Sequence, residues 1–169
     1  MKNSLHVVAA AGLALGAVLG MAGTMAAAPN LRAAFWALDS VGLVVATSIL
    51  AISYFRKGKD AIAAGFLVYA IGEAVMLSGT AATLEASVPA FAAGTALWSA
   101  ALLLTSVPRE FDHWTRATGI LGALLFAVTS AKIFWGEQLT PIARPLPFYA
   151  YPFLVFTFAG WTWTLLRER

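Results

Sequence analysis

Three ionisable residues stand inside long apolar runs of the chain: Asp39, Glu73 and Lys132. An unpaired charged side chain inside a bilayer costs about 2.5–3.5 kcal/mol, so such residues usually line an ion or substrate pathway or pair between helices. Asp39 and Lys132 have opposite signs and similar expected depths, which predicts that they pair or share water. Glu73 has no cation at its expected depth, and apolar surroundings favour the neutral form of a carboxyl group.

The same residues predict a polar cavity that opens to the outer face of a membrane. Glu73 is expected near the midplane, as a proton or cation site at the base of the cavity, with Asp39 and Lys132 about 7–10 Å nearer the outer face. Tyr69 and Thr80 share a helical face with Glu73 and are expected to line the cavity. The charged residues expected around its mouth are Glu85, Glu137 and Arg144. The alternative is a structural ion pair with one protonated glutamate, and rim charges that are simply solvated.

The composition excludes several kinds of site. The chain has no cysteine, which rules out disulfides, thiolate catalysis and iron–sulfur clusters. Its histidines, His6 and His113, are expected at the cytoplasmic rim, far from the carboxyl groups, and neither a metal site nor another cofactor is predicted. The sequence also lacks a metalloprotease helix and a phosphate-binding glycine loop. An enzyme is therefore the least favoured class of function.

The elements that position these residues follow from the composition. Of the 169 residues, 60% are hydrophobic and 11% are charged, whereas soluble domains have roughly 45–50% apolar and about 25% charged residues. Because so few charged residues cannot cover the core of a soluble protein, most of the surface is expected to face lipid. A spanning helix needs about 20 apolar residues. The stretches that qualify are residues 5–27, 33–55, 61–83, 88–107, 117–136 and 147–166. Residues 1–169 are thus predicted to form one all-α membrane domain with six transmembrane helices.

The placement of Lys and Arg predicts the orientation of these helices. Basic residues concentrate on the cytoplasmic side of membrane proteins. In a six-span arrangement one side holds Lys2, Arg56, Lys57, Lys59, Arg109, Arg116, Arg167 and Arg169. The other side holds Arg32, Lys132 and Arg144. Both termini are therefore predicted to be cytoplasmic, in the inner membrane of the cell. Interfacial positions are predicted for Trp36 and Trp135 on the outer side and for Trp114, Trp161 and Trp163 on the inner side.

The first apolar stretch has a second interpretation. Lys2, an apolar run and Ala26-Ala27-Ala28 resemble a signal peptide with a small-residue cleavage site. The run is longer than a usual signal core, and Pro29 would directly follow the cut, so retention of residues 1–28 is favoured. The sixth stretch is also ambiguous at its start, because Pro141, Pro145, Pro147 and Pro152 interrupt it. Proline is tolerated at a helix start, so the alternative start of this helix is near Pro152, after a stiff connector or a lid over the cavity.

Two patterns concern how the helices pack. Glycines recur every four residues in the first stretch, at Gly12, Gly16 and Gly20, and every seven residues in the third, at Gly65, Gly72 and Gly79. Each set lies on one helical face and lets another backbone approach closely. Packing within the chain is favoured over a homo-oligomer formed through the first helix. Local similarities in matching order also suggest a 3+3 inverted repeat, although helices rich in Ala, Gly and Leu also match by chance.

Three classes of function remain open. The outer-half charges and the repeat favour a small-solute or ion transporter or channel. The glycine faces and the small number of polar residues favour a non-catalytic accessory or lipid-binding subunit. A membrane-embedded enzyme comes third, because no acid–base pair or metal ligand set stands out.

Overall fold

The computed structural model describes residues 2–79 and 83–167 and is all-helical. Its elements are α1 (Lys2–Met25), α2 (Pro29–Arg56), α3 (Asp60–Gly79), α4 (Val88–Ser106), α5 (His113–Phe134), the 3-10 turn η1 (Phe148–Ala150) and α6 (Tyr151–Arg167). The predicted helical bundle is confirmed. Five helices, α1 to α5, are long and apolar enough to cross a membrane. The sixth helix has 17 residues and begins next to Pro152, one of the two starts that the sequence allowed.

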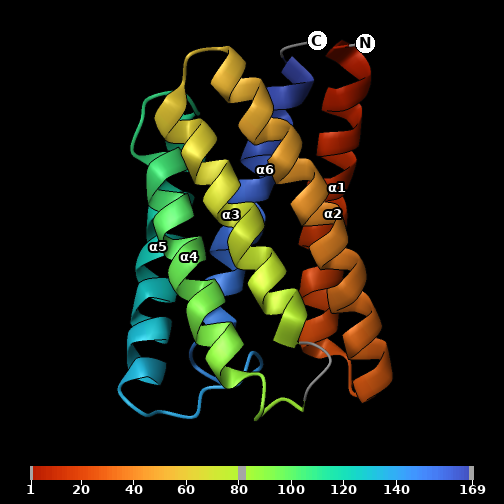
Figure 1. The fold of residues 1–169 in the computed structure, drawn as a ribbon, viewed down its shortest axis with the longest axis vertical. Helices are drawn as coiled ribbons and strands as arrows, with labels where there is room; N and C mark the ends of the chain where they lie inside the picture. The colour runs from red at the N-terminus through yellow and green to blue at the C-terminus, as the bar shows by residue number, and fades with distance from the viewer. Residues whose placement is uncertain (1, 80–82, 168–169) are drawn as a thin grey trace.

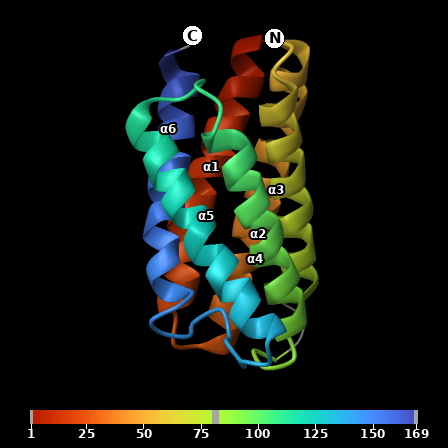
Figure 2. The same ribbon diagram turned by 90° about the vertical axis from the view of Figure 1, so that its left-hand side faces the viewer.

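Consecutive helices run antiparallel, and each packs against the next (Figure 1). The pair α1 and α6 also make contact, so the six helices close into a ring. Both chain ends lie at one end of the bundle, which also holds the α2–α3 turn and the α4–α5 loop (Figure 2). The α2–α3 turn is tight because Gly58 adopts φ +68, a conformation that side-chain-bearing residues rarely take.

Glycine faces hold two neighbouring helix pairs together. Gly12, Gly16 and Gly20 of α1 lie against α2, and a Cβ atom on Gly12 would stand 2.5 Å from the carbonyl oxygen of Gly42. On α3, the side chains and backbone of α4 lie against Gly65, Gly72 and Gly79. These predicted packing residues therefore serve contacts within the chain. A homo-oligomer through α1 stays a prediction, and it would have to use another face of this helix.

An aromatic cluster fills the interior of the ring towards the end that holds the termini. The Trp161 ring meets Phe66 at 4.7 Å and Phe158 at 5.6 Å between ring centroids. Trp161 is only 1% exposed, so it faces the interior of the ring and not its surroundings, as a residue of an interfacial belt would. Trp163 is 47% exposed, because two residues along a helix turn the side chain by about 200°. The exposed and the buried sides of α6 are both apolar, so hydrophobicity alone did not separate the two tryptophans.

Candidate functional site

A cavity of about 410 Å³ lies inside the ring, in the half of the bundle away from the chain termini. Its wall comes from α1, α2, α3, α4 and α6, together with the loop that precedes α4 and Pro141 of the α5–α6 connector. Tyr151 holds that connector in place, because its hydroxyl donates a hydrogen bond of 2.8 Å to the carbonyl oxygen of Pro141. The proline-rich connector therefore contributes to the cavity wall.

Two carboxyl groups from adjacent helices stand at the base of this cavity. Asp39 is 8% exposed and Glu73 is 2% exposed, and both line the cavity. The hydroxyl of Ser40 donates a hydrogen bond of 2.6 Å to Glu73 Oε1, which ties α2 to α3. The two carboxyl groups also interact electrostatically with each other. Such a pair can share one proton or one cation.

The helices place these groups by their buried faces. On α2, Ser40, Leu43, Thr47 and Leu50 are buried at intervals of three or four residues, which is the spacing of one helical face. Asp39 adjoins this face. The hydroxyl of Thr47 has its partner within the same helix, because it donates a hydrogen bond of 2.7 Å to the carbonyl oxygen of Leu43. The polar groups left to face the cavity from this part of α2 are therefore those of Asp39 and Ser40.

Trp98 of α4 covers the floor of the cavity. Its ring stacks on that of Tyr69, with 5.5 Å between the ring centroids and 4° between the ring planes. Its indole N–H lies near enough to the Glu73 carboxyl group to interact with it. The geometry falls short of a hydrogen bond, because Trp98 Nε1 and Glu73 Oε2 are both left without a partner of good geometry. Asp39 Oδ1 is left without one as well.

Tyr69 and Thr80 were both expected in the cavity wall. Tyr69 is fully buried and is not among the lining residues. It lies behind Trp98, close enough to interact electrostatically with Glu73. Thr80 lies outside the described residues.

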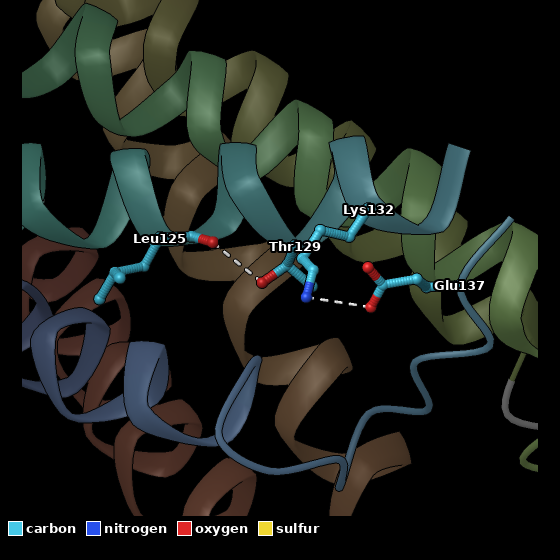
Figure 3. Close-up of polar contacts among 4 residues, drawn as sticks. All are labelled: Leu125, Thr129, Lys132 and Glu137. Carbon is cyan, nitrogen blue, oxygen red and sulfur yellow. Dashed lines mark hydrogen bonds and ion pairs between the residues drawn. The ribbon is translucent and has the colours of Figure 1, made fainter. Parts of the chain in front are cut away.

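Lys132 does not pair with Asp39, so the predicted ion pair is wrong. Its ammonium group forms an ion pair of 3.0 Å with Glu137, at the end of α5 (Figure 3). The reason is local: Gly136, with φ +103, reverses the chain and brings Glu137 back over the last turn of the helix. The backbone N–H of Glu137 also donates 3.0 Å to the carbonyl oxygen of Lys132. Lys132 is not among the residues that line the cavity, and Asp39 interacts with Glu73 instead.

The residues expected at the mouth divide in the same way. Glu85 is exposed and lines the cavity. Glu137 pairs with Lys132, and the guanidinium group of Arg144 lies 4.2 Å from the centroid of the Phe148 ring. Neither Glu137 nor Arg144 is a lining residue. The structure therefore brings Asp39, Glu73 and Glu85 to one cavity and leaves the other charges on the connector and the end of α5.

Sequence reasoning missed several lining residues: Arg32, Trp36, Ser40, Trp98 and Tyr151. A signal was available for those on α2, because Trp36, Ser40, Leu43 and Thr47 repeat at the spacing of one helical face. Arg32 combines two roles near the mouth. It donates 2.7 Å to the carbonyl oxygen of Ala26, and its guanidinium carbon lies 6.0 Å from the centroid of the Trp36 ring.

Comparisons of the chain with protein-family models, curated proteins and solved structures give no match. The basis for a functional proposal is therefore the geometry and chemistry of the cavity, since a bundle of helices by itself does not fix a function.

Proposed function

We propose that the protein is a multi-pass membrane transporter or channel that moves a small solute or ion through the cavity. The observation that carries the proposal is the cavity of about 410 Å³ with Asp39 and Glu73 at its base. Buried carboxyl groups inside a membrane bundle are costly, and they most often mark ion or substrate pathways. Asp39, Ser40 and Glu73 act together as the proton or cation site, and Glu85 stands at the entrance.

Six membrane spans and cytoplasmic termini complete this proposal. At 1.5 Å per residue, α6 extends about 25 Å, slightly less than the hydrocarbon core of about 30 Å. The turn η1 precedes it directly and supplies the missing length. The basic residues of the α2–α3 turn and the α4–α5 loop lie at the end that holds the termini (Figure 1). By the charge rule, that end faces the cytoplasm of an inner membrane, so the cavity opens outward.

The 3+3 inverted repeat belongs to the same proposal. In this arrangement α1–α3 correspond to α4–α6, with the site near the midplane. When the two halves are aligned by these similarities, Ala117 corresponds to Asp39 and Gly160 corresponds to Glu73. The second half would then lack both carboxyl groups, and the site would be asymmetric.

A lipid-binding accessory subunit is the second candidate, and the cavity wall favours it in one respect. Most of the wall is apolar, with side chains such as Leu43, Met76, Phe91 and Val155. A lipid-binding protein would hold an acyl chain there, and no water-soluble molecule would pass. The two candidates differ in whether water reaches the cavity and whether any solute crosses.

Thiol labelling tests the water-filled, outward-facing cavity, and the cysteine-free chain suits it. We expect Met76→Cys, on the cavity wall, to react in intact cells with a membrane-impermeant cationic methanethiosulfonate. Ile71→Cys, on an exposed and therefore lipid-facing position of the same helix, should stay unmodified. Asp60→Cys, exposed at the end that holds the termini, should react only after the membrane is permeabilised. Equal protection of Met76→Cys and Ile71→Cys would contradict a water-filled cavity, and labelling of Asp60→Cys in intact cells would contradict the proposed orientation.

Flux through proteoliposomes tests the role of Glu73. We expect Glu73→Gln to lower the flux of any ion or solute that the wild-type protein carries by at least about tenfold, because an amide neither releases a proton nor balances the charge of a cation. Uptake of H⁺, Na⁺ and K⁺ is measured first. The matched control is Glu110→Gln, at the opposite end of the bundle, where Glu110 pairs with Lys59 at 2.9 Å near the surface. Equal flux in Glu73→Gln and wild type would remove Glu73 from the mechanism.

A further inference from the structure

The base of the cavity presents polar atoms that lack a hydrogen-bond partner among the described residues: Asp39 Oδ1, Glu73 Oε2 and Trp98 Nε1. All three side chains line the cavity and are more than nine-tenths buried. Buried polar atoms almost always have a partner, because an unpaired one keeps the full cost of its desolvation. The two carboxyl oxygens are therefore positioned to accept hydrogen bonds from a bound ligand.

The base of the cavity holds two acidic side chains and no basic one. None of the ion pairs among the described residues includes Asp39 or Glu73. Arg32 also lines the cavity, but its Cα lies seven residues before that of Asp39, about 10 Å nearer the mouth along α2. Its Nη2 donates a hydrogen bond of 2.7 Å to the carbonyl oxygen of Ala26, and its Nε has no hydrogen-bond partner among the described residues. A positively charged group of a ligand is therefore favoured at the base of the cavity. An anionic group would be favoured only at the mouth, beside Arg32.

The size and wall of the cavity favour an organic cation over a metal ion. A volume of about 410 Å³ falls within the range of pockets that hold small organic molecules. Ca²⁺ takes six to eight oxygen ligands as a rule, whereas in the part of the chain that the structure describes no three His, Asp or Glu side chains come together. Above the carboxyl groups the wall contains the aromatic side chains of Trp36 and Phe91. Aromatic faces attract organic cations and bury apolar groups.

The neighbouring helix leaves Asp39 accessible from the cavity. Gly20 of α1 lies opposite this carboxyl group, and a Cβ atom there would stand 3.0 Å from Asp39 Oδ2. Gly16, one turn away, also lines the cavity. The absence of side chains at these positions keeps α1 from covering the carboxyl group.

We propose that the cavity binds an organic cation that combines an ammonium group with an apolar body of aromatic size. The ammonium N–H groups donate to Asp39 Oδ1 and Glu73 Oε2, and the apolar body lies against Trp36 and Phe91. This inference rests on the proposed function, because it names the substrate class of the same cavity. An amine free in solution and the amine of a lipid headgroup share this chemistry.

Calorimetry with three ligands of similar shape tests whether the cavity prefers a positively charged ligand. The purified protein, in nanodiscs of phosphatidylglycerol, is titrated with 3,3-diphenylpropylamine, with 3,3-diphenyl-1-propanol and with 3,3-diphenylpropionate. We expect the amine to bind at least about tenfold more tightly than the alcohol, and the carboxylate to bind most weakly. The matched control is Asp39→Asn/Glu73→Gln in the same nanodiscs, which corrects for partition of the amine into the lipid. Equal affinities in the wild-type protein, or an amine preference that persists in the double variant, would overturn the proposal.

A second measurement does not depend on the folding of the double variant. In Met76→Cys, the amine should slow labelling by the methanethiosulfonate at least about threefold more than the alcohol does, because both occupy the cavity but the amine binds more tightly. Equal slowing by the two ligands would also overturn the proposal. Nanodiscs that contain phosphatidylethanolamine identify the source of the ligand. Weaker amine binding there supports a lipid headgroup, and unchanged binding supports a free amine.

The outcomes separate this inference from the proposed function. If the amine binds preferentially but no ion or amine crosses proteoliposomes, the ligand class stands and the transport proposal fails. If Glu73→Gln abolishes a flux while the three ligands bind alike, transport stands and the organic-cation inference fails.

Discussion

Trp161→Ala is expected to lower the free energy of unfolding by about 3–5 kcal/mol, the usual cost of removing a large buried aromatic side chain. Trp161 contacts Phe66, Tyr69, Phe111 and Phe158, which come from α3, the α4–α5 loop and α6. Its removal leaves a void at the centre of the ring, where neither lipid nor side chains can fill it easily. Equilibrium unfolding in mixed micelles with increasing sodium dodecyl sulfate measures the change.

Trp163→Ala provides the matched control, because it removes the same side chain two residues along the same helix. Trp163 is half-exposed, and its ring interacts with the guanidinium group of Arg167 at 4.6 Å. Such a surface cation–π contact contributes about 0.5–1 kcal/mol. Equal losses in the two variants would mean that Trp161 does not lie in the interior and would contradict the ring arrangement of the helices.

Gly12→Val is expected to destabilise the protein by about 1–3 kcal/mol or more, as overpacking does. The first atom of the new side chain would lie 2.5 Å from the carbonyl oxygen of Gly42 and 2.9 Å from the Cβ atom of Ala46. Backbone cannot move aside as a flexible side chain can, so α1 would have to separate from α2. Thermal unfolding in detergent measures the loss, with Gly12→Ala expected to fall between the wild type and Gly12→Val.

Ala14→Val is the control for this substitution, since Ala14 is exposed on the same helix and should change stability by no more than about 0.5 kcal/mol. The experiment also distinguishes the two interpretations of the glycine face. If this face bound a second copy of the chain, Gly12→Val would dissociate an oligomer, as seen by light scattering, without lowering the stability of the monomer. That result would contradict the packing of α1 on α2.

The helices themselves could be predicted from the sequence nearly to their ends. Residues 88–107 were expected to form a helix, and α4 covers Val88–Ser106. The apolar stretches are long, and proline and glycine punctuate the gaps between them, so length and composition suffice. Gly12, Gly16 and Gly20 were also identified as packing residues because their spacing places them on one face.

The candidate site could be predicted only in part. Asp39 and Glu73 were recognised because ionisable residues are conspicuous in apolar runs, but their partners were not. Lys132 forms an ion pair with a residue five positions further along the chain. Glu73 accepts a hydrogen bond from Ser40 of another helix. Sign and expected depth suggested the wrong pair, since neither gives the direction in which a side chain leaves its helix.

By itself, the sequence determined that the chain forms apolar helices with glycine faces and a few costly charges, because these properties depend on local composition and spacing. Only the tertiary structure decided which faces are interior. In a soluble helix the polar face identifies the outside, whereas here the exposed and the buried faces are both apolar. The sequence around Trp161 and Trp163 therefore does not distinguish them, although Trp161 is buried and Trp163 is exposed. For the same reason, only the closed ring brings Asp39 and Glu73 together around one cavity.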